Sequence, residues 1–201
     1  MRRNGEPFKV GQGVEHPIVI PKMATTMQST NRLLRTLSTG VSYGAWQMLP
    51  GANHARVLAS SSFDWILVDC EHGALSDSDM HDAVPAIAAC GVSPIVRIPV
   101  NDGWWVKRAL DAGAHGIMVP LLKTVQQAEE IVLDSKFPPW GRRGFGSPFP
   151  MMRFAKDLSG LEYLKQANDA LVTVIQIETK EALENVRHLQ SLHNSLCVGS
   201  R

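Results

Sequence analysis

The chain has 201 residues, of which 44% are hydrophobic and 19% charged, a composition typical of a folded globular protein and not of a disordered one. Its formal net charge of +1 balances 20 basic against 19 acidic residues, so no strong electrostatic field favours nucleic acid or an anionic membrane surface. We therefore expect a small-molecule partner, and neither a nucleic acid nor a membrane.

The three cysteines, Cys70, Cys90 and Cys197, are odd in number and widely spaced. This pattern argues against a disulfide framework and against a zinc ribbon, and it favours a reducing compartment. No apolar run approaches the roughly 18 residues that a membrane-spanning helix needs, and the first ten residues lack the apolar stretch of a secretory signal. The sequence thus predicts a cytoplasmic protein.

Residues 1–40 are predicted to hold an N-terminal extension, disordered up to Lys22, and a first helix. An organellar transit role for this extension is the weaker alternative, because Glu6 and Glu15 interrupt it and no basic amphipathic pattern is present. Residues 41–201 are predicted to form one partial barrel domain.

From about Val41 onward, short apolar runs alternate with helical patterns, which is typical of βαβ units and a parallel sheet. Strands are predicted at residues 41–49, 63–69, 93–99, 115–122 and 170–178, and helices at 76–90, 101–113, 124–136, 159–167 and 179–189. A long loop rich in Pro and Gly occupies 137–150, and a loop of that length is more often functional than idle.

Several residues predict where these helices begin and end. Ser76 or Asp77 can cap the helix predicted at 76–90. Asn101 or Asp102 can cap the helix predicted at 101–113, and Gly113 can end it. Pro85 predicts a kink or a displaced start, because proline lacks the amide hydrogen that a helix interior uses.

Repeated βα units leave two α/β fold classes, a doubly wound sheet and a (β/α)₈ TIM-type barrel. A dinucleotide-binding sheet needs G-x-G-x-x-G directly after an early strand. Here Gly141, Gly144 and Gly146 have the spacing G-x-x-G-x-G and lie in a late loop. The sequence therefore favours the barrel.

In such a barrel the catalytic groups lie at the carboxyl ends of the strands, because these ends converge on one face. This rule selects polar residues at the ends of the predicted strands: Asp69, Glu71, His72, Arg97, Gln176 and Glu178. Residues from Pro120 onward, after the fourth strand, belong to the same face. An acid, a base, a cation and a carboxylate are thus expected around one mouth.

Asp69 and His72 are close enough in sequence for a tight turn to bring the carboxylate against one imidazole nitrogen. That contact would fix the tautomer and leave the other nitrogen as a proton acceptor, which predicts a general-base dyad. The alternative is a loop histidine beside a helix cap, since placement alone does not set orientation.

Arg97 lies in an apolar strand, where an unpaired guanidinium would be costly, so it requires an anion. The anion is either a structural partner or a substrate carboxylate or enolate oxygen that matches the planar fork of donors. Glu178 suits Mg²⁺ or Mn²⁺ at the mouth, or equally a cap on the next helix. Gln176 points to the same side of the strand and is available to a substrate or a ligand water.

Other candidates are weaker. His115, Trp104 and Trp105 are expected to pack in the outer layer, and the tryptophan pair could also serve a subunit interface. Cys70 adjoins the candidate dyad, but a small buried hydrophobe is the better interpretation, because nothing in the sequence lowers its pKa.

Five separated motifs occur in order: VDCEHG, VRIPVND, LDAGAHGIMVP, FPPWGRRG and VIQIET. From about Val41 to Val186 the chain thereby resembles the HpcH/HpaI aldolase family. The resemblance implies a homo-oligomeric barrel enzyme that binds pyruvate through a divalent metal, Mg²⁺ or Mn²⁺, and cleaves or forms 2-oxo-4-hydroxy acids.

The resemblance also implies residue roles. It matches Glu178 to a metal ligand, Arg97 to the cation that holds the pyruvate enolate, and Gln176 to a substrate-side glutamine. His72 matches the acid/base and Asp69 its carboxylate partner. A metal and an arginine together would stabilise the enolate charge.

The family pattern fails after Val186. Its second metal carboxylate lies on the next strand in a Gly-Pro-x-Asp-Leu-type segment, whereas no Asp or Glu follows Glu184 here. We therefore expect about five βα units, without strands six to eight and without that second carboxylate. Two alternatives stay open: oxaloacetate decarboxylation to the same enolate, as in macrophomate synthase, and a catalytically inactive truncated member.

Overall fold

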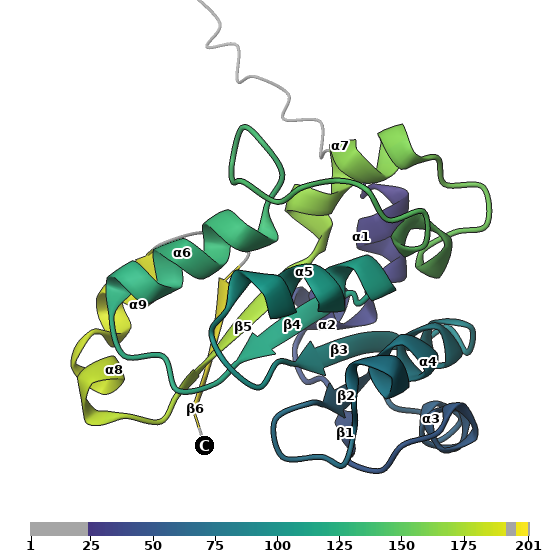
Figure 1. The fold of residues 1–201 in the computed structure, drawn as a ribbon, viewed down its shortest axis with the longest axis horizontal. Helices are drawn as coiled ribbons and strands as arrows, with labels where there is room; N and C mark the ends of the chain where they lie inside the picture. Colours follow the sequence, from purple (N-terminus) through teal and green to yellow (C-terminus); the bar gives the residue numbers. More distant parts are fainter. Residues whose placement is uncertain (1–23, 192–195, 201) are drawn as a thin grey trace, which may run out of the picture.

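A computed structural model describes residues 24–191 and 196–200, so the predicted disordered extension, residues 1–22, lies outside the described residues. Six parallel strands form one sheet in the order β1-β2-β3-β4-β5-β6 (Figure 1). They are β1 (Gly44–Gln47), β2 (Trp65–Asp69), β3 (Ser93–Arg97), β4 (Gly116–Val119), β5 (Val172–Ile177) and β6 (Leu196–Ser200). Each strand pairs with the next one along the chain, which is the strand order of a barrel and confirms the predicted fold class.

The prediction of about five βα units is confirmed, because β1 to β5 are each followed by a helix, but the expectation that a sixth strand is missing is wrong. Residues Leu196–Ser200 form β6, which pairs in parallel with β5, with Ile175 opposite Val198. The five residues LCVGS show no clear period-2 pattern on their own. Their strand conformation depends on the free hydrogen-bonding edge of β5, which the sequence pattern alone does not reveal.

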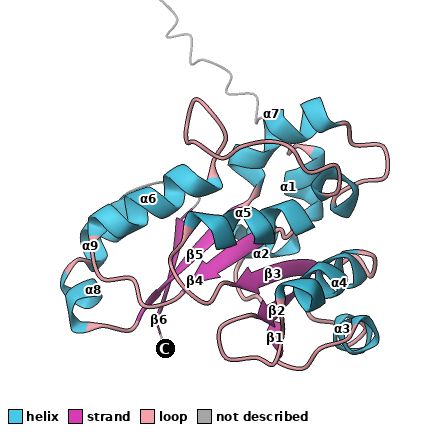
Figure 2. Ribbon diagram, viewed as in Figure 1, coloured by secondary structure: helices cyan, strands magenta, loops and turns pink. Residues whose placement is uncertain are grey.

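Two helices, α1 (Thr26–Thr30) and α2 (Arg32–Thr39), precede β1. The helices between β1 and β6 are, in chain order, α3 (Ala52–Ala59), α4 (Asp77–Ala88), α5 (Gly103–Ala112), α6 (Val125–Ser135), the 3₁₀ helix η1 (Pro150–Arg153), α7 (Gly160–Ala170), α8 (Lys180–Glu184) and α9 (Val186–Ser191) (Figure 2). The sequence analysis missed α3, whose start at Gly51 has no side-chain cap. It also predicted one helix where α8 and α9 are separate.

Most predicted helix ends are confirmed. The Ser76 side chain caps α4, the Asp102 side chain caps α5, and Gly113 ends α5 in the left-handed conformation at φ +101°. Pro85 lies inside α4, which still begins at Asp77, so the displaced helix start is wrong.

The two faces of the sheet bury different sets of side chains. On the outer face, Ile66, Val68 and Val96 belong to the large core under the helices, of which α4 and α5 lie in front of the strands in Figure 1. On the inner face, Leu67 and Ile95 form a smaller cluster with Leu33 and Val172. This alternation follows from the period of two along a strand.

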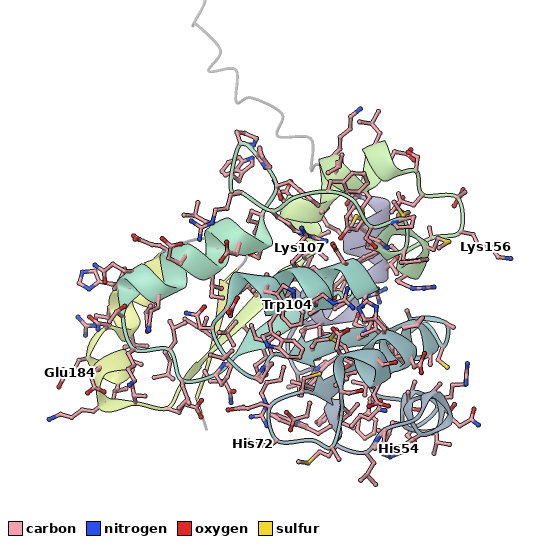
Figure 3. All side chains as sticks on the ribbon, viewed as in Figure 1. His54, His72, Trp104, Lys107, Lys156 and Glu184 are labelled. Carbon is pink, nitrogen blue, oxygen red and sulfur yellow. The ribbon has the colours of Figure 1, made fainter. Side chains whose placement is uncertain are left out.

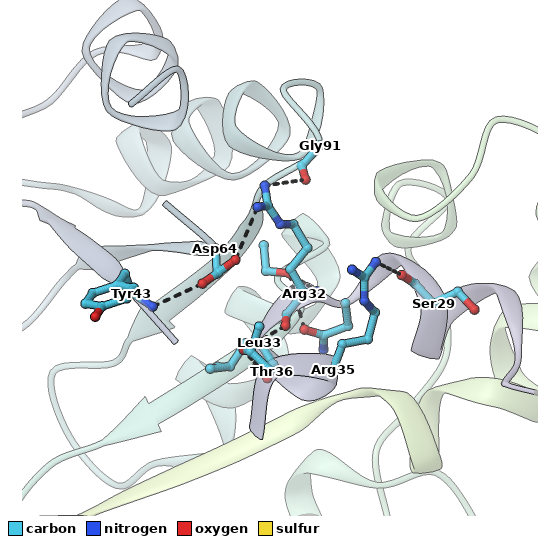
Figure 4. Close-up of polar contacts among 10 residues, drawn as sticks. Ser29, Arg32, Leu33, Arg35, Thr36, Tyr43, Asp64 and Gly91 are labelled. Carbon is cyan, nitrogen blue, oxygen red and sulfur yellow. Dashed lines mark hydrogen bonds and ion pairs between the residues drawn. The ribbon is translucent and has the colours of Figure 1, made fainter. Parts of the chain in front are cut away.

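Helix α2 closes the inner face at the amino ends of the strands. Arg32 Nη2 lies 3.2 Å from Asp64 Oδ1, and Asp64 Oδ2 accepts a hydrogen bond from the Tyr43 amide (Figure 4). The Leu33 side chain of α2 is buried against the inner cluster. Helix α2 therefore packs on the sheet, and its Leu33 side chain is part of the core.

Asn31 fixes this helix to three other elements. Its Nδ2 donates 2.8 Å hydrogen bonds to the carbonyls of His115 and Ala170, and its Oδ1 accepts from the Leu34 amide, which caps α2. The Oδ1 also lies 3.3 Å from the Ser93 hydroxyl, and the side chain is fully buried. Both hydrogens of the amide are thus used, and its oxygen accepts from the first turn of α2.

Substitution Asn31→Ala should lower the free energy of unfolding by about 2–4 kcal/mol, because it removes a helix cap and two hydrogen bonds to backbone carbonyls. Chemical denaturation followed by circular dichroism measures this loss. Asn53→Ala, at an exposed position of α3, is the matched control and should change stability by less than about 0.5 kcal/mol. Equal effects of the two substitutions would contradict the anchoring role.

His115 is a second buried polar residue at this end of the sheet. Its Nε2 lies 3.0 Å from the Arg153 carbonyl, which can only accept, so Nε2 carries the proton and Nδ1 accepts from the Ser93 hydroxyl at 3.0 Å. The ring also stacks on Phe154. Burial lowers the pKa of His115 to about 4, so the ring is neutral at pH 7.

This depressed pKa makes stability depend on pH. Below pH 6.5 the unfolded chain protonates His115, whereas the folded ring resists protonation down to about pH 4, so stability falls as the pH drops through this range. The contribution lost is up to about 3 kcal/mol. Chemical denaturation at pH 7 and at pH 4.5 should show a lower free energy of unfolding at pH 4.5 for the wild type. The difference between the two pH values should be smaller for His115→Gln. A His54→Gln variant, altered in α3 instead, is the control.

Within the part of the chain that the structure describes, no helix is both long enough and apolar enough to cross a membrane.

Candidate active site

Strands β2, β3 and β5 end at the same edge of the sheet and bring three predicted site residues together. Asp69 lies directly opposite Arg97 in the register of β2 and β3. Gln176, near the end of β5, places its Oε1 3.5 Å from Arg97 Nη1. The sequence rule that strand ends converge therefore holds for these three side chains.

Arg97 is the centre of this group. Its Nε and Nη2 donate to the two oxygens of Asp69 at 2.9 and 2.7 Å, a bidentate ion pair, and the guanidinium lies over the Trp46 ring, 4.4 Å from its centroid. Only 2% of the Arg97 side chain is exposed, and that of Asp69 is fully buried. The anion that the sequence required for Arg97 is, in this structure, Asp69.

The Asp69 carboxylate is held in its charged form. Burial alone would raise its pKa, but the hydrogen bonds from Arg97 and from the backbone amides of His72 and Glu71 outweigh burial, so the pKa lies below its ordinary value. Asp69 is thus negatively charged at neutral pH, and both of its oxygens accept hydrogen bonds.

The predicted contact between the Asp69 carboxylate and the His72 ring is wrong. Asp69 Oδ1 accepts from the backbone amide of His72 at 3.1 Å, whereas the ring Nε2 lies 3.5 Å from Glu71 Oε1. The turn after β2 directs main-chain donors, and not the imidazole, at the buried carboxylate. The His72 side chain is 63% exposed at the edge of the molecule (Figure 3).

Glu71 thereby takes the place that the sequence analysis gave to Asp69. It was selected by position at a strand end but was given no role. Its side chain is 11% exposed, and Oε2 lies 2.9 Å from Arg97 Nη1. This separation is that of an ion pair, yet among the described residues no donor is aligned to hydrogen-bond Oε2. One oxygen of a largely buried carboxylate is therefore only partly satisfied.

Trp46 was also missed. It lies on β1, one residue before the strand ends, and covers one face of the Arg97 guanidinium. The first strand was predicted to end at residue 49, three residues after Trp46, so the rule of carboxyl strand ends did not select it.

Glu178 follows β5 directly, and its side chain is exposed. Its Oε1 accepts a 2.9 Å hydrogen bond from the Leu121 amide in the loop after β4. The alternative cap role is filled by Thr179, whose side chain accepts from the Ala182 amide at the start of α8. Glu178 thus lies at the mouth, with its other oxygen available.

The weaker candidates lie outside this group. Trp104 is 56% exposed on α5, Trp105 packs partly against the outer core, and His115 lies at the amino end of β4, where it serves the fold. Cys70 is buried, and burial followed by the charge of Asp69 raises its pKa to about 12. A thiolate nucleophile at Cys70 is therefore unfavourable, in agreement with the sequence interpretation.

The residues at this mouth fit a divalent cation only in part. Glu71, Glu178 and Asp69 set three carboxylates against the single guanidinium of Arg97, and an excess of negative charge with oxygen donors suits a hard cation such as Mg²⁺. However, no cluster of three or more metal-ligating side chains occurs among residues 24–191. A complete site would need further ligands.

A model of one protein family matches residues 43–198, which cover most of the chain and all of the candidate site. The chain belongs to the HpcH/HpaI aldolase/citrate lyase family. The predicted family is therefore confirmed.

Two curated relatives illustrate the relationship. Over 149 residues the chain is 38% identical to a 2-dehydro-3,6-dideoxy-6-sulfogluconate aldolase from Pseudomonas putida, covering 74% of this chain and 57% of the relative. It is 36% identical to a 4-hydroxy-2-oxo-heptane-1,7-dioate aldolase from Salmonella dublin, covering 71% of this chain and 54% of the relative. The family member described here thus spans just over half the length of these relatives.

Solved structures agree with the fold. An HpcH/HpaI aldolase/citrate lyase family protein from Burkholderia cenocepacia superposes with a TM-score of 0.73 at 31% identity, over 85% of this chain and 68% of that one. Macrophomate synthase superposes with a TM-score of 0.69 at 25% identity, over 94% of this chain and 69% of that one.

Removing the central guanidinium should destabilise the fold. Arg97→Met leaves the buried Asp69 carboxylate unpaired, and we expect a loss of about 3–5 kcal/mol in the free energy of unfolding. Adding Asp69→Asn should recover part of this loss, because the buried charge is then gone. Denaturation of both single variants and the double variant measures the coupling, and additive effects would contradict a direct pair.

Proposed function

We propose that this family member, as part of its complete protein, is a metal-dependent carbon–carbon lyase that cleaves or forms 2-oxo-4-hydroxy acids through a pyruvate enolate. The observation that carries this proposal is the buried Arg97 at the carboxyl ends of the strands, with Gln176 of β5 beside it and Glu178 directly after β5. The named activities of the curated relatives, which are aldolases, support the same reaction class.

In the proposed reaction, Arg97 and Gln176 hold the 2-oxo acid. Asp69 engages Nε and Nη2 of the guanidinium, whereas Nη1 lies 2.9 Å from Glu71 Oε2. Nη1 also donates a long 3.5 Å hydrogen bond to Gln176, which a substrate oxygen could replace. Asp69 then acts as a positioning residue that fixes the guanidinium plane. A rigid, buried cation is suited to stabilise the enolate oxygen, because it needs no reorganisation as charge develops.

Proton transfer is assigned to His72, with Glu71 as its partner. The exposed ring can reach a bound substrate, and the Glu71 carboxylate at 3.5 Å from Nε2 stabilises the protonated ring. The ring would accept the proton of the 4-hydroxyl group as the carbon–carbon bond breaks, and return a proton to the enolate carbon.

A divalent cation would be held by Glu178, with further ligands from outside the described cluster. When bound, Mg²⁺ or Mn²⁺ would polarise the 2-oxo group and stabilise the enolate charge. The identity of the ion, the aldehyde, the homo-oligomeric state and the cytoplasmic location stay predictions. The comparisons do not favour the decarboxylase alternative, because the curated relatives described above are aldolases.

Enolate formation can be tested without knowing the aldehyde. Incubating the chain with pyruvate and Mg²⁺ or Mn²⁺ in D₂O should exchange the methyl protons of pyruvate for deuterium, and proton NMR follows the exchange. Glu178→Gln should slow the exchange by at least about ten-fold, because the carboxylate that would hold the cation is lost. Chelation of the metal should have the same effect on the wild type.

The matched control is Glu184→Gln, which removes an exposed carboxylate from α8 (Figure 3) and should leave the exchange rate unchanged. Circular dichroism establishes that each variant is folded. A folded wild-type chain that shows no metal-dependent exchange would overturn the proposal for this chain, and exchange that survives in Glu178→Gln would remove Glu178 from the metal site.

A further inference from the structure

A cavity of about 240 Å³ lies between α4, α5 and η1, on the helical side of the sheet. Its walls are His81 from α4, Ala112 from the end of α5, Phe149, and Arg153 from η1. The candidate active-site cluster lies on the other side of the sheet, because Asp69 alternates with the outward-facing Val68 and Cys70. The cavity is therefore separate from that cluster.

Two nitrogen atoms in these walls have no hydrogen-bond partner in the part of the chain that the structure describes. They are His81 Nε2 and Arg153 Nε, and both atoms are buried. The nearest acidic atom to His81, Asp77 Oδ1, is 3.9 Å from Nε2, which is too far for a hydrogen bond. Arg153 Nε is always a donor, and His81 Nε2 is a donor when it carries the ring proton. A buried donor without an acceptor costs about 1–3 kcal/mol, so both atoms would gain from an acceptor in the cavity.

The nearby carboxylates are already paired with other arginines. Asp77 accepts two hydrogen bonds from Arg108, at 2.9 and 2.5 Å, and Asp111 lies 3.0 Å from Arg143. Among the described residues, Arg153 forms no ion pair within 4.0 Å. The positive group of the cavity is thus left without a counter-charge.

Burial lowers the pKa values of both His81 and Arg153, which favours their neutral forms. Desolvation lowers the pKa of His81, with a smaller effect of Arg108 in the same direction, against the opposing charges of Asp77, Asp111 and Asp82. Desolvation also lowers the pKa of Arg153. In both cases the cost of desolvation outweighs whatever compensation the charged form receives, and a bound anion would add to that compensation.

The backbone holds Arg153 in place. Gly113 has φ +101°, and a Cβ at this position would collide with the Arg153 side chain, so only glycine allows the arginine to lie across the end of α5. The Arg153 carbonyl accepts the hydrogen bond from the buried His115. The base of the side chain is therefore fixed before any ligand binds, which reduces the entropic cost of binding.

We propose that this cavity binds a small oxyanion, a phosphate or carboxylate group on a short organic stem, with His81 Nε2 and Arg153 Nε as its donors. A volume of about 240 Å³ corresponds to roughly eight water molecules at about 30 Å³ each, enough for one such group and a few carbons. Phe149 and Ala112 give the stem an apolar wall. Nothing in this proposal depends on the aldolase reaction.

Inorganic phosphate and acetate are the two probes, since they separate the tetrahedral from the planar form of the ligand. Each is titrated into the 201-residue chain while the ring-proton signals of His81, assigned with a His81→Gln variant, are followed by NMR. Binding in the cavity should shift these signals and raise the apparent pKa of His81. Arg153→Gln and His81→Gln should each weaken binding at least ten-fold by calorimetry.

Lys156→Gln is the matched control, because it removes an exposed positive charge three residues from Arg153 that does not line the cavity (Figure 3). It should leave affinity unchanged, and Arg153→Lys, which keeps the charge but not the Nε donor, should bind weakly. Thermal unfolding establishes that the variants are folded. Failure of both probes to bind the folded wild type, or equal loss of affinity in Lys156→Gln, would overturn the proposal.

Discussion

The bidentate pair between Arg97 and Asp69 is the constraint on which the candidate site depends. The two residues are direct neighbours in the register of β2 and β3, so the pair forms only when these strands are aligned as observed. A shift of one residue would turn the guanidinium towards the apolar outer core, where it would meet no anion. The ion pair and the strand register therefore enforce each other.

The pairing of Asp69 with Arg97 affects which carboxylate lies beside the His72 ring. Arg97 and two main-chain amides hold Asp69, and the His72 ring lies beside Glu71 instead. Glu71, two residues nearer to the histidine, is the carboxylate that can respond to a proton on the imidazole. Arg97 contacts Glu71 as well, so a change in charge at one of these groups affects the others.

The opposite ends of the strands are held by a neutral network. Asn31, Ser93 and His115 join α2 to the starts of β3 and β4, and His115 continues this network to Arg153. The same arginine lines the proposed oxyanion cavity on the helical side. This network thus connects α2, which covers the inner face of the sheet, to the wall of the proposed cavity. A change in the network should therefore affect both the free energy of unfolding and anion binding.

The sequence by itself determined the α/β barrel class, the family and most helix ends, because periodicity, caps and left-handed glycines act over a few residues. It also determined which residues gather at the carboxyl ends of the strands, since this follows from parallel pairing alone. Only the tertiary structure decided which residues these side chains and strands contact. The contact between His72 and Glu71, the cover of Trp46 over Arg97, and the pairing that makes a strand of Leu196–Ser200 all depend on atoms distant in the chain or on the direction of a turn. Local sequence patterns do not specify these contacts, because they arise only once the strands are in register.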